Sequence, residues 1–271
     1  MSRFDGRVVL VTGSTGMAAS AARALVAEGA SIFVTSRTPE HVRALADELD
    51  SGETLGWRAA DLTSEAEAEA AVAACVERFG RIDALYAVAG ISGRRFGDGP
   101  LHEATLAGWE AVMTANVTGL FLVARATVRR MLAQDPDADG SRGVLLAMSS
   151  ALARHPSPGY FATHAYAASK GAIEAFIRAV ASSYAPHGIR ANAIAPSLVA
   201  TPMSRRAQAD PAIGAYLLAK QPLAAGPIEA DAVTPVALHL LSRESRMITG
   251  QVIEVDAGWA VSEPPQPPQS P

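Results

Sequence analysis

The sequence predicts an α/β fold: one domain built on a doubly wound sheet of about seven parallel strands, with helices on both faces. Three observations predict it. Short runs rich in β-branched and other apolar residues alternate with longer alanine-rich segments along most of the chain. The short runs are continuously apolar, as expected when helices cover both faces of a sheet. The 271 residues are 49% hydrophobic and 18% charged, so the chain can bury one large core.

Strands and helices are expected to alternate in order along the chain. The first helix follows the glycine-containing stretch "VTGSTGMAAS". The second begins at Pro39, which suits a first helical position, and the third follows the capping and acidic residues of "DLTSEAEAE". The strands are expected at residues 7–11, 31–35, 54–60, 84–90, 143–150, 190–196 and 250–255. The helices are expected near residues 16–28, 39–50, 64–79, 103–132, 166–186 and 229–241.

Two stretches fall outside this alternation. Residues 197–227 contain four prolines among short helical pieces and follow the end of a strand, where open α/β sheets bind ligands. We interpret them as a substrate lid. Residues 263–271, "EPPQPPQSP", cannot form a packed core and are expected to be a disordered, proline-rich tail, which leaves residues 1–262 as the single domain.

The composition argues against several classes of function. A net charge of −4 gives no general attraction to nucleic acid or to an anionic membrane, so a small-molecule partner is expected. The single Cys75 rules out an internal disulfide and a cysteine-based zinc cluster, and His155 and His164 lack supporting metal ligands. The N-terminus enters a strand too early for a signal peptide, and the apolar run "AVMTANVTGLFLVA" is shorter than the ~20 residues of a membrane helix. We therefore expect a cytoplasmic protein.

The stretch "VTGSTGMAAS" predicts a phosphate-binding turn between the first strand and the first helix. Gly13 permits the turn, and Gly16 lets the backbone approach a ligand. The start of the helix would offer backbone N–H groups and the positive end of its dipole to a pyrophosphate. Taken by itself, the turn is equally compatible with a tight structural corner.

The end of the second strand, "VTSRTPE", indicates which cofactor is preferred. Sites that bind NAD(H) place an acid about 20 residues beyond the glycine turn, where it binds the ribose hydroxyls. This chain has Ser36 followed by Arg37, and a guanidinium can bind a 2'-phosphate through charge-assisted hydrogen bonds. We therefore predict NADP(H) rather than NAD(H), with an ordinary surface arginine as the alternative.

The stretch "HAYAASKGA" places Tyr166 and Lys170 four residues apart, so that both side chains leave one face of a helix. A tyrosine that acts as an acid or base near neutral pH needs its pKa lowered by about 3 units, or ~4 kcal/mol. A neighbouring ammonium typically supplies about 1 to 3 of these units. The pair follows "LLAMSS", a strand that ends in two serines, which makes a catalytic group the favoured interpretation.

These motifs, in this order, resemble the main branch of the short-chain dehydrogenase/reductase (SDR) family, with its Ser-Tyr-Lys-Asn catalytic residues and its Rossmann-type fold. The resemblance covers nearly the whole chain. It implies that Ser150 binds the substrate oxygen, that Tyr166 is the acid or base, and that Lys170 assists it. Asn116 in "NVTGLF" matches the asparagine that holds a water between the lysine and solvent. Strand-end hydrogen bonding and helix packing are the structural alternatives for Ser150 and Asn116.

The sequence departs from the family pattern in the cofactor site. The glycine turn is one residue shorter, Ala18 replaces the third glycine, and "YAVAG" has Ala87 and Val88 where the family has two asparagines. A remodelled but working phosphate cradle is expected, with other hydrogen bonds tying the strands together. The residues expected to hold the cofactor are Gly13, Ser14, Thr15, Gly16, Met17, Ser36, Arg37, Asp61, Leu62, Ala89, Gly90, Tyr166, Lys170, Pro196, Val199 and Thr201.

The connection between Ser150 and Tyr166, "ALARHPSPGYFATHA", is about three residues longer than in the family. The added residues are expected to form a wall of the substrate pocket. The specificity residues this suggests are His155, Tyr160 and Phe161, each of which could equally be a loop residue packed on the surface.

Together these features predict an NADP(H)-dependent oxidoreductase that transfers a hydride between nicotinamide and a carbonyl or secondary alcohol, most simply a ketone reductase. An NAD-linked alcohol dehydrogenase and a non-catalytic NADP(H)-sensing regulator or scaffold are the alternatives. The helix near residues 166–186 is apolar around most of its circumference and needs cover on two sides. We therefore expect a homo-oligomer, a tetramer or dimer.

Overall fold

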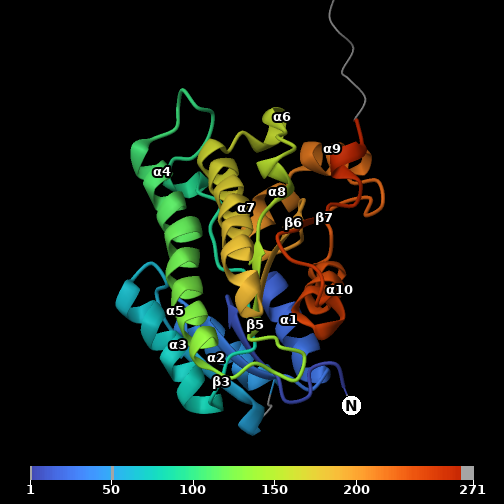
Figure 1. Cartoon of the computed structure of the whole chain (residues 1–271). Coiled ribbons are helices and arrows are strands. Elements are labelled where there is room, and N and C mark those ends of the chain that lie inside the picture. Colours follow the sequence, from blue (N-terminus) through green and yellow to red (C-terminus); the bar gives the residue numbers. More distant parts are fainter. Residues whose placement is uncertain (1, 50–51, 264–271) are drawn as a thin grey trace, which may run out of the picture.

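A parallel sheet of seven strands runs through the centre of the protein in the order β3-β2-β1-β4-β5-β6-β7. The structure is a computed structural model that describes residues 2–49 and 52–263 (Figure 1). Every neighbouring pair of strands is parallel, which confirms the predicted fold class. The strands are β1 (Val8–Thr12), β2 (Ser31–Ser36), β3 (Leu55–Ala59), β4 (Ala84–Ala87), β5 (Gly143–Met148), β6 (Ile189–Pro196) and β7 (Val252–Val255).

Helices cover both faces of this sheet. The α-helices are α1 (Gly16–Ala27), α2 (Pro39–Leu49), α3 (Glu65–Phe79), α4 (Leu106–Met113), α5 (Gly119–Ala133), α6 (Pro158–Phe161), α7 (His164–Tyr184), α8 (Arg205–Gln208), α9 (Pro211–Lys220) and α10 (Ala230–Leu241). Pro39 begins α2, as predicted. Ser64 caps α3 by accepting a hydrogen bond from the Glu67 amide, also as predicted.

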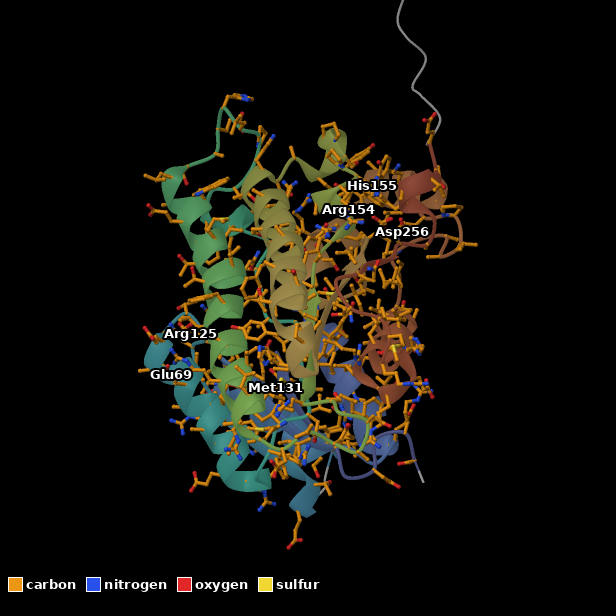
Figure 2. The ribbon with its side chains drawn as sticks, in the orientation of Figure 1. Glu69, Arg125, Met131, Arg154, His155 and Asp256 are labelled. Atoms are coloured by element: carbon orange, nitrogen blue, oxygen red, sulfur yellow. The ribbon has the colours of Figure 1, made fainter. Side chains whose placement is uncertain are left out.

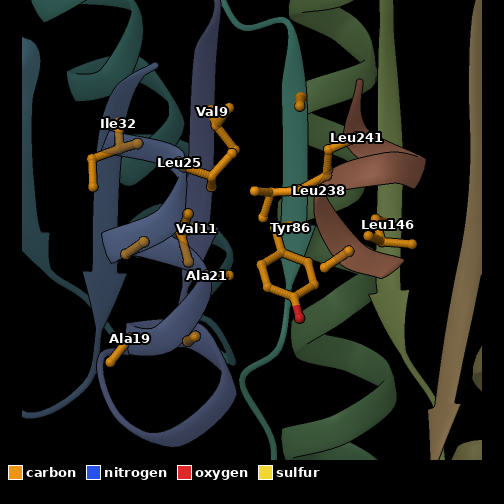
Figure 3. Close-up of a cluster of buried hydrophobic side chains, with 14 of the residues drawn as sticks. Val9, Val11, Ala19, Ala21, Leu25, Ile32, Tyr86, Leu146, Leu238 and Leu241 are labelled. Atoms are coloured by element: carbon orange, nitrogen blue, oxygen red, sulfur yellow. The ribbon is translucent and has the colours of Figure 1, made fainter. Parts of the chain in front are cut away.

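Alternate residues of each strand pack on opposite faces and build two cores. Val9 and Val11 of β1 join α1, α2 and α10 in one core, whereas Val8 and Leu10 join α3, α5 and α7 in the other. Figure 3 shows Tyr86 of β4 among aliphatic side chains of the first core. Each fully buried aliphatic side chain stabilises the fold by ~1.5–3 kcal/mol. These two cores fix the sheet whose strand ends carry the site.

One predicted helix is interrupted. The helix expected near residues 103–132 is α4 and α5 joined by a π-helical turn, Thr114–Thr118, in which the Gly119 amide donates to the Thr114 carbonyl. The whole stretch Leu106–Ala133 is long and apolar enough to cross a membrane by length and composition alone. Half of its apolar window is buried against the rest of the protein, as in the core helix of a globular domain. It therefore gives no argument for a membrane.

The segment predicted as a lid is helical in part. Residues 197–227 contain α8, α9 and a short 3-10 turn, and Asp210 caps α9 by accepting from the amides of Ala212 and Ile213. Its apolar side chains share a small separate core with Ala151 and Trp259. The proline-rich tail lies outside the described residues from position 264 onward.

The order of the strands locates a crevice. Chain connections from β1 run to β2 and β3 on one side, and from β4 to β5, β6 and β7 on the other. In open sheets of this kind, ligands bind outside the carboxyl ends of the strands at the point where the order reverses. The carboxyl ends of β1 and β4, at Thr12 and Ala87, are therefore where a site is expected.

Candidate active site

Two cavities adjoin at the carboxyl ends of the strands. The cleft beside β1, β2 and β4 is about 1090 Å³ and holds most of the residues expected to bind the cofactor. The second cavity, of about 700 Å³, contains Ser150 and Tyr166. Met203 lines both, so the two spaces lie on either side of this residue. We call them the nucleotide cleft and the substrate cavity.

The glycine turn presents free backbone donors to the nucleotide cleft. Gly13 and Gly16 have φ of +99° and +54°, which favour glycine. Along the described chain, no acceptor is assigned to the amides of residues 14–17, and the Thr15 side chain does not cap α1. The first turn of α1 contains no acid. This set of donors at the start of a 12-residue helix fits an anionic diphosphate.

The replacement of the third glycine by Ala18 is accommodated within the turn. A Cβ atom on Gly13 would lie 3.2 Å from the Ala18 methyl, so the missing side chain of one residue leaves room for the other. A Cβ on Gly16 would lie 2.8 Å from the Thr201 methyl. Gly16 thus lets Thr201 approach the turn closely, and Thr201 borders the cleft as predicted.

Arg37 stands at the rim of the nucleotide cleft with its guanidinium uncommitted. The side chain is exposed, and within residues 2–49 and 52–263 it has no hydrogen bond or ion pair. Ser36 accepts a hydrogen bond from the Ser14 hydroxyl at 2.9 Å, which links the strand end to the glycine turn. A free cation at this position is available to a phosphate.

Asp61 serves a turn as well as lining the nucleotide cleft. Its carboxylate accepts hydrogen bonds from the backbone and side chain of Thr63 at 3.0 and 2.8 Å. The bond from the Thr63 amide and the nearby charge of Arg37 lower the pKa of Asp61, although partial burial opposes them. Asp61 thus shapes the turn before α3, whose cap is Ser64, and its expected contact with the cofactor stays a prediction.

Thr12 replaces the missing asparagine pair as the brace between β1 and β4. Its hydroxyl accepts hydrogen bonds from the amides of Val88 and Ala89 at 3.1 and 3.2 Å. The sequence reasoning missed this residue, because a threonine at the end of a strand has no distinctive pattern.

Most of the expected cofactor residues line one space. The exceptions are Pro196 and Val199, which are buried, Tyr166, which lines the substrate cavity instead, and Lys170, which lines neither space. The cleft residues that the sequence reasoning did not select are Ala18, Thr38, His41, Ala60, Thr63, Val88, Ile91, Ala115, Pro202 and Met203. Most of these lie within a few residues of a selected one, so proximity in sequence was the only signal that could have found them.

Ser150 and Tyr166 share one wall of the substrate cavity. Ser150 follows β5, lies close enough to Tyr166 to affect the pKa of its phenol, and accepts a hydrogen bond from the Leu152 amide at 3.3 Å. Lys170 lies one turn further along α7, with its amine 5.5 Å from the centre of the Tyr166 ring. The start of α7 is held by Asp98, whose carboxylate accepts from the amides of Ala165 and Tyr166, both at 3.0 Å. The sequence reasoning missed Asp98, which comes from a loop more than 60 residues away.

Burial dominates the electrostatics of this wall. It lowers the pKa of Lys170 to about 8, and the amine donates a hydrogen bond to the Met148 carbonyl at 2.7 Å. Burial also raises the pKa of Tyr166, and Ser150 opposes that rise. Lys170 is not among these influences, so the lowering of the phenol pKa by Lys170 stays a prediction.

Asn116 lies in the π-helical turn, and its side chain is fully engaged. Its carbonyl accepts from the Ile91 amide at 2.7 Å, and its amide donates to the Ile91 carbonyl and the Ser169 hydroxyl, both at 3.0 Å. A Cβ on Gly90 would lie 2.9 Å from this carbonyl and 3.8 Å from the Lys170 amine. The site thus brings Asn116 near Lys170 across Gly90, and the water that it would hold stays a prediction.

The longer connection before α7 lines the substrate cavity near its two ends, whereas Arg154 and His155 anchor it outside the cavity. Arg154 pairs with the buried Glu174 at 2.8 Å, and His155 lies 3.0 Å from Glu254. Figure 2 shows Arg154 and His155 side by side near the C-terminal segment. Tyr160 stacks on Tyr216 at 4.9 Å and does not line the cavity.

Of the three predicted specificity residues, the structure therefore places only Phe161 in the lining of the substrate cavity. His155 and Tyr160 are used in packing and pairing because the added residues fold back onto the protein. No cluster of three or more metal-ligating side chains occurs in the described part of the chain.

Replacing Lys170 with Met should stabilise the protein near neutral pH. The pKa falls from 10.5 to about 8 on folding, so below pH 8 the buried ammonium destabilises the folded state. Between these values the unfolded chain binds more protons, so the wild type gains stability as the pH rises and the variant does not. Urea titrations at about pH 7 and about pH 9.5 give the free energy of unfolding of each protein. Between these two pH values it should rise by ~2 kcal/mol more in the wild type than in the variant. Equal pH dependence in the two proteins would contradict this assignment.

Comparisons with known proteins extend these observations. A family model described as enoyl-(acyl carrier protein) reductase matches residues 11–260. Momilactone A synthase from Oryza sativa subsp. japonica is 34% identical over 263 residues, covering 96% of this chain and 92% of that protein.

Two solved structures have the same fold over nearly the whole length. A short-chain type dehydrogenase/reductase from Mycobacterium ulcerans has a TM-score of 0.87 at 27% identity and covers 98% of this chain and 94% of its own. A gluconate 5-dehydrogenase from Burkholderia cenocepacia J2315, in complex with NADP and tartrate, has a TM-score of 0.84 at 31% identity and covers 95% and 96%. The named relatives thus include dehydrogenases and reductases.

Proposed function

Because the chain belongs to the short-chain dehydrogenase/reductase family, we propose that it transfers a hydride between NADP(H) and a ketone or the corresponding secondary alcohol. The protein is an oxidoreductase that acts on CH–OH or C=O groups. The observation that carries the finer proposal is that the two cavities share Met203 in their linings, while Ser150 and Tyr166 line the substrate cavity together. A carbonyl in the substrate cavity can there be reached from the nucleotide cleft.

The residues of the nucleotide cleft fit a phosphorylated dinucleotide. The free amides of residues 14–17 would hold the diphosphate, and Arg37 would hold a 2'-phosphate. The bound nicotinamide supplies or accepts the hydride. The uncommitted guanidinium of Arg37 supports NADP(H) over NAD(H), because an acid at this position would repel the phosphate.

The chain's own side chains would manage the substrate oxygen and its proton. Ser150 would donate a hydrogen bond to the carbonyl oxygen, and Tyr166 would protonate it. Lys170 would bind the nicotinamide ribose, stabilise the phenolate that results and receive protons from solvent through Asn116 and water. Reversing these transfers gives oxidation of the alcohol.

The proposal is tested by following the absorbance of the reduced nicotinamide with a panel of ketones and aldehydes. Turnover that is faster with NADPH than with NADH supports it. Preference for NADH would instead support the NAD-linked alcohol dehydrogenase. Tight NADPH binding without turnover of any carbonyl would favour a regulator or scaffold, so cofactor binding is measured separately by fluorescence.

We also propose that the protein is a cytoplasmic homo-oligomer, a tetramer or dimer, in which a second subunit covers the outer face of α7. Ala168, Ala175 and Ala179 are exposed on this helix, and Phe121 of the neighbouring α5 is 42% exposed. Sedimentation at micromolar concentration should give a dimer or tetramer, and Ala175→Arg should shift it toward the monomer because it places a charge in the contact. Ala73→Arg on α3 is the matched control. A monomeric wild type would contradict the proposal.

A further inference from the structure

Two arginines from distant parts of the chain line the substrate cavity. Arg94 lies in the loop after β4, and Arg206 lies in α8 of the lid. They share the cavity with Ser150 and Tyr166, and its lining contains no aspartate or glutamate. The cavity is therefore positively charged although the protein as a whole carries a net charge of −4.

Neither guanidinium is neutralised by an ion pair. Among the residues that the structure describes, Arg206 has no hydrogen-bond or ion-pair partner, and Arg94 donates to the Tyr160 carbonyl at 3.0 Å. Burial and the nearby charge of Arg206 lower the pKa of Arg94, while Asp98 opposes them. The carboxylate of Asp98 is itself occupied by the amides at the start of α7.

Two like charges close together repel each other, and an anion bound between them relieves that repulsion. Arginines that recognise carboxylates and phosphates are found in this arrangement, because several guanidinium donors can converge on one anion. Two guanidiniums without ion-pair partners in a substrate cavity therefore indicate an anionic group on the ligand. The next residue, Arg95, differs from Arg94: it lies over the Phe96 ring at 4.9 Å and does not line the cavity.

The rest of the lining indicates the chemistry of the remainder of that ligand. Apart from the arginines and the Ser150–Tyr166 wall, the lining is mainly apolar or aromatic. The residues that form this apolar part are Ala151, Leu152, Phe161, Leu198, Met203, Ala207 and Trp259. Such a surface buries hydrocarbon favourably. The remaining lining residues are hydroxyl-bearing: Ser92, Thr163, Ser197 and Ser204.

We propose that the substrate is a carbonyl compound that carries an anionic group, a carboxylate or a phosphate, separated from the carbonyl by an apolar segment. Arg94 and Arg206 bind the anionic group, and Ser150 and Tyr166 face the carbonyl. This inference rests on the proposed function and assigns its substrate class. Arg94 and Arg206 are specificity residues in it and take no part in the hydride transfer.

The test compares medium-chain keto acids with their methyl esters, which keep the carbonyl and lose the charge. The wild type should have a kcat/KM for the acid at least ~10-fold above that for the ester. Arg206→Met should lower kcat/KM for the acid by ~10- to 100-fold, mainly by raising KM. It should change kcat/KM for the ester by less than about threefold. Because Arg206 is exposed, this variant is expected to fold, whereas Arg94→Met also removes the bond to the Tyr160 carbonyl.

The chain offers matched controls beside both residues. Arg205→Met and Arg95→Met remove the same charge outside the lining of the cavity, and the preference for the acid should survive in both. A ketone with a terminal phosphate, assayed in parallel, distinguishes the two kinds of anion by its kcat/KM relative to the keto acid.

A second measurement does not depend on turnover. Trp259 lines the cavity, so titrating the protein with a saturated carboxylate of the same length should change its fluorescence. The Kd should rise ~10-fold or more in Arg206→Met and stay unchanged in Arg205→Met. Equal kcat/KM for acid and ester in the wild type, or equal effects of Arg205→Met and Arg206→Met, would overturn the inference. Reduction of neutral ketones with no preference for anions would overturn it while leaving the proposed function intact.

Discussion

Tyr166→Phe should lower kcat by ~10²–10⁴-fold while leaving the Kd for NADPH within about threefold of the wild type. The substitution removes one hydroxyl from the wall of the substrate cavity, and with it the acidic proton. The ring keeps its place on α7, 5.5 Å from the Lys170 amine, so the packing of the wall is retained. Absorbance of the reduced nicotinamide gives kcat, and nicotinamide fluorescence gives the Kd.

Tyr216→Phe is the matched control for this result. The Tyr216 hydroxyl bonds to Ser157 at 2.7 Å, close to the substrate cavity but outside its lining. Removing it should leave kcat within about threefold of the wild type. If Tyr166→Phe kept the wild-type kcat, another group would have to supply the proton, and the assignment of the acid would be wrong.

Arg37→Asp should lower kcat/KM for NADPH by ~10²-fold or more and change kcat/KM for NADH far less. The substitution removes charge-assisted hydrogen bonds worth ~1.5–3 kcal/mol and adds repulsion between a carboxylate and the 2'-phosphate. NADH lacks that phosphate. Steady-state kinetics with both cofactors measure the effect, which should shrink as ionic strength rises because Arg37 is exposed.

Arg58→Asp makes the same change of charge on β3, outside the nucleotide cleft. It should change kcat/KM for NADPH and kcat/KM for NADH equally, and each by less than about threefold. If Arg37→Asp affected NADPH and NADH to the same extent, the phosphate contact would be refuted and the arginine would have only a structural role.

The predictions that held for the site concern residues that are close in sequence or at the ends of strands. Tyr166 and Lys170 share a helix face because the helical repeat puts them there, and the glycine turn follows from two residues within one loop. Ser150 reaches the same wall because parallel strands end at one edge of the sheet. Local geometry and sheet topology are sufficient for all of these.

The predictions that failed depend on side-chain contacts between distant segments. His155 is drawn to Glu254, 99 residues away, and Tyr160 stacks on Tyr216, so neither lines the substrate cavity. The π-helical turn at Asn116 was expected to be ordinary helix, because apolar periodicity cannot distinguish the two. Nothing in the sequence alone pairs these residues, since many loop conformations satisfy the same local preferences.

The sequence by itself determined the order of strands and helices, the parallel sheet and the family, because hydrophobic periodicity and turn residues act over a few neighbouring positions. The tertiary structure alone decided that Asp98 holds the start of α7, that Thr12 braces β4, and that Arg94 and Arg206 meet in one cavity. Each of these contacts joins segments that are far apart in the sequence. They come close together in space only when the two cores have packed on the sheet.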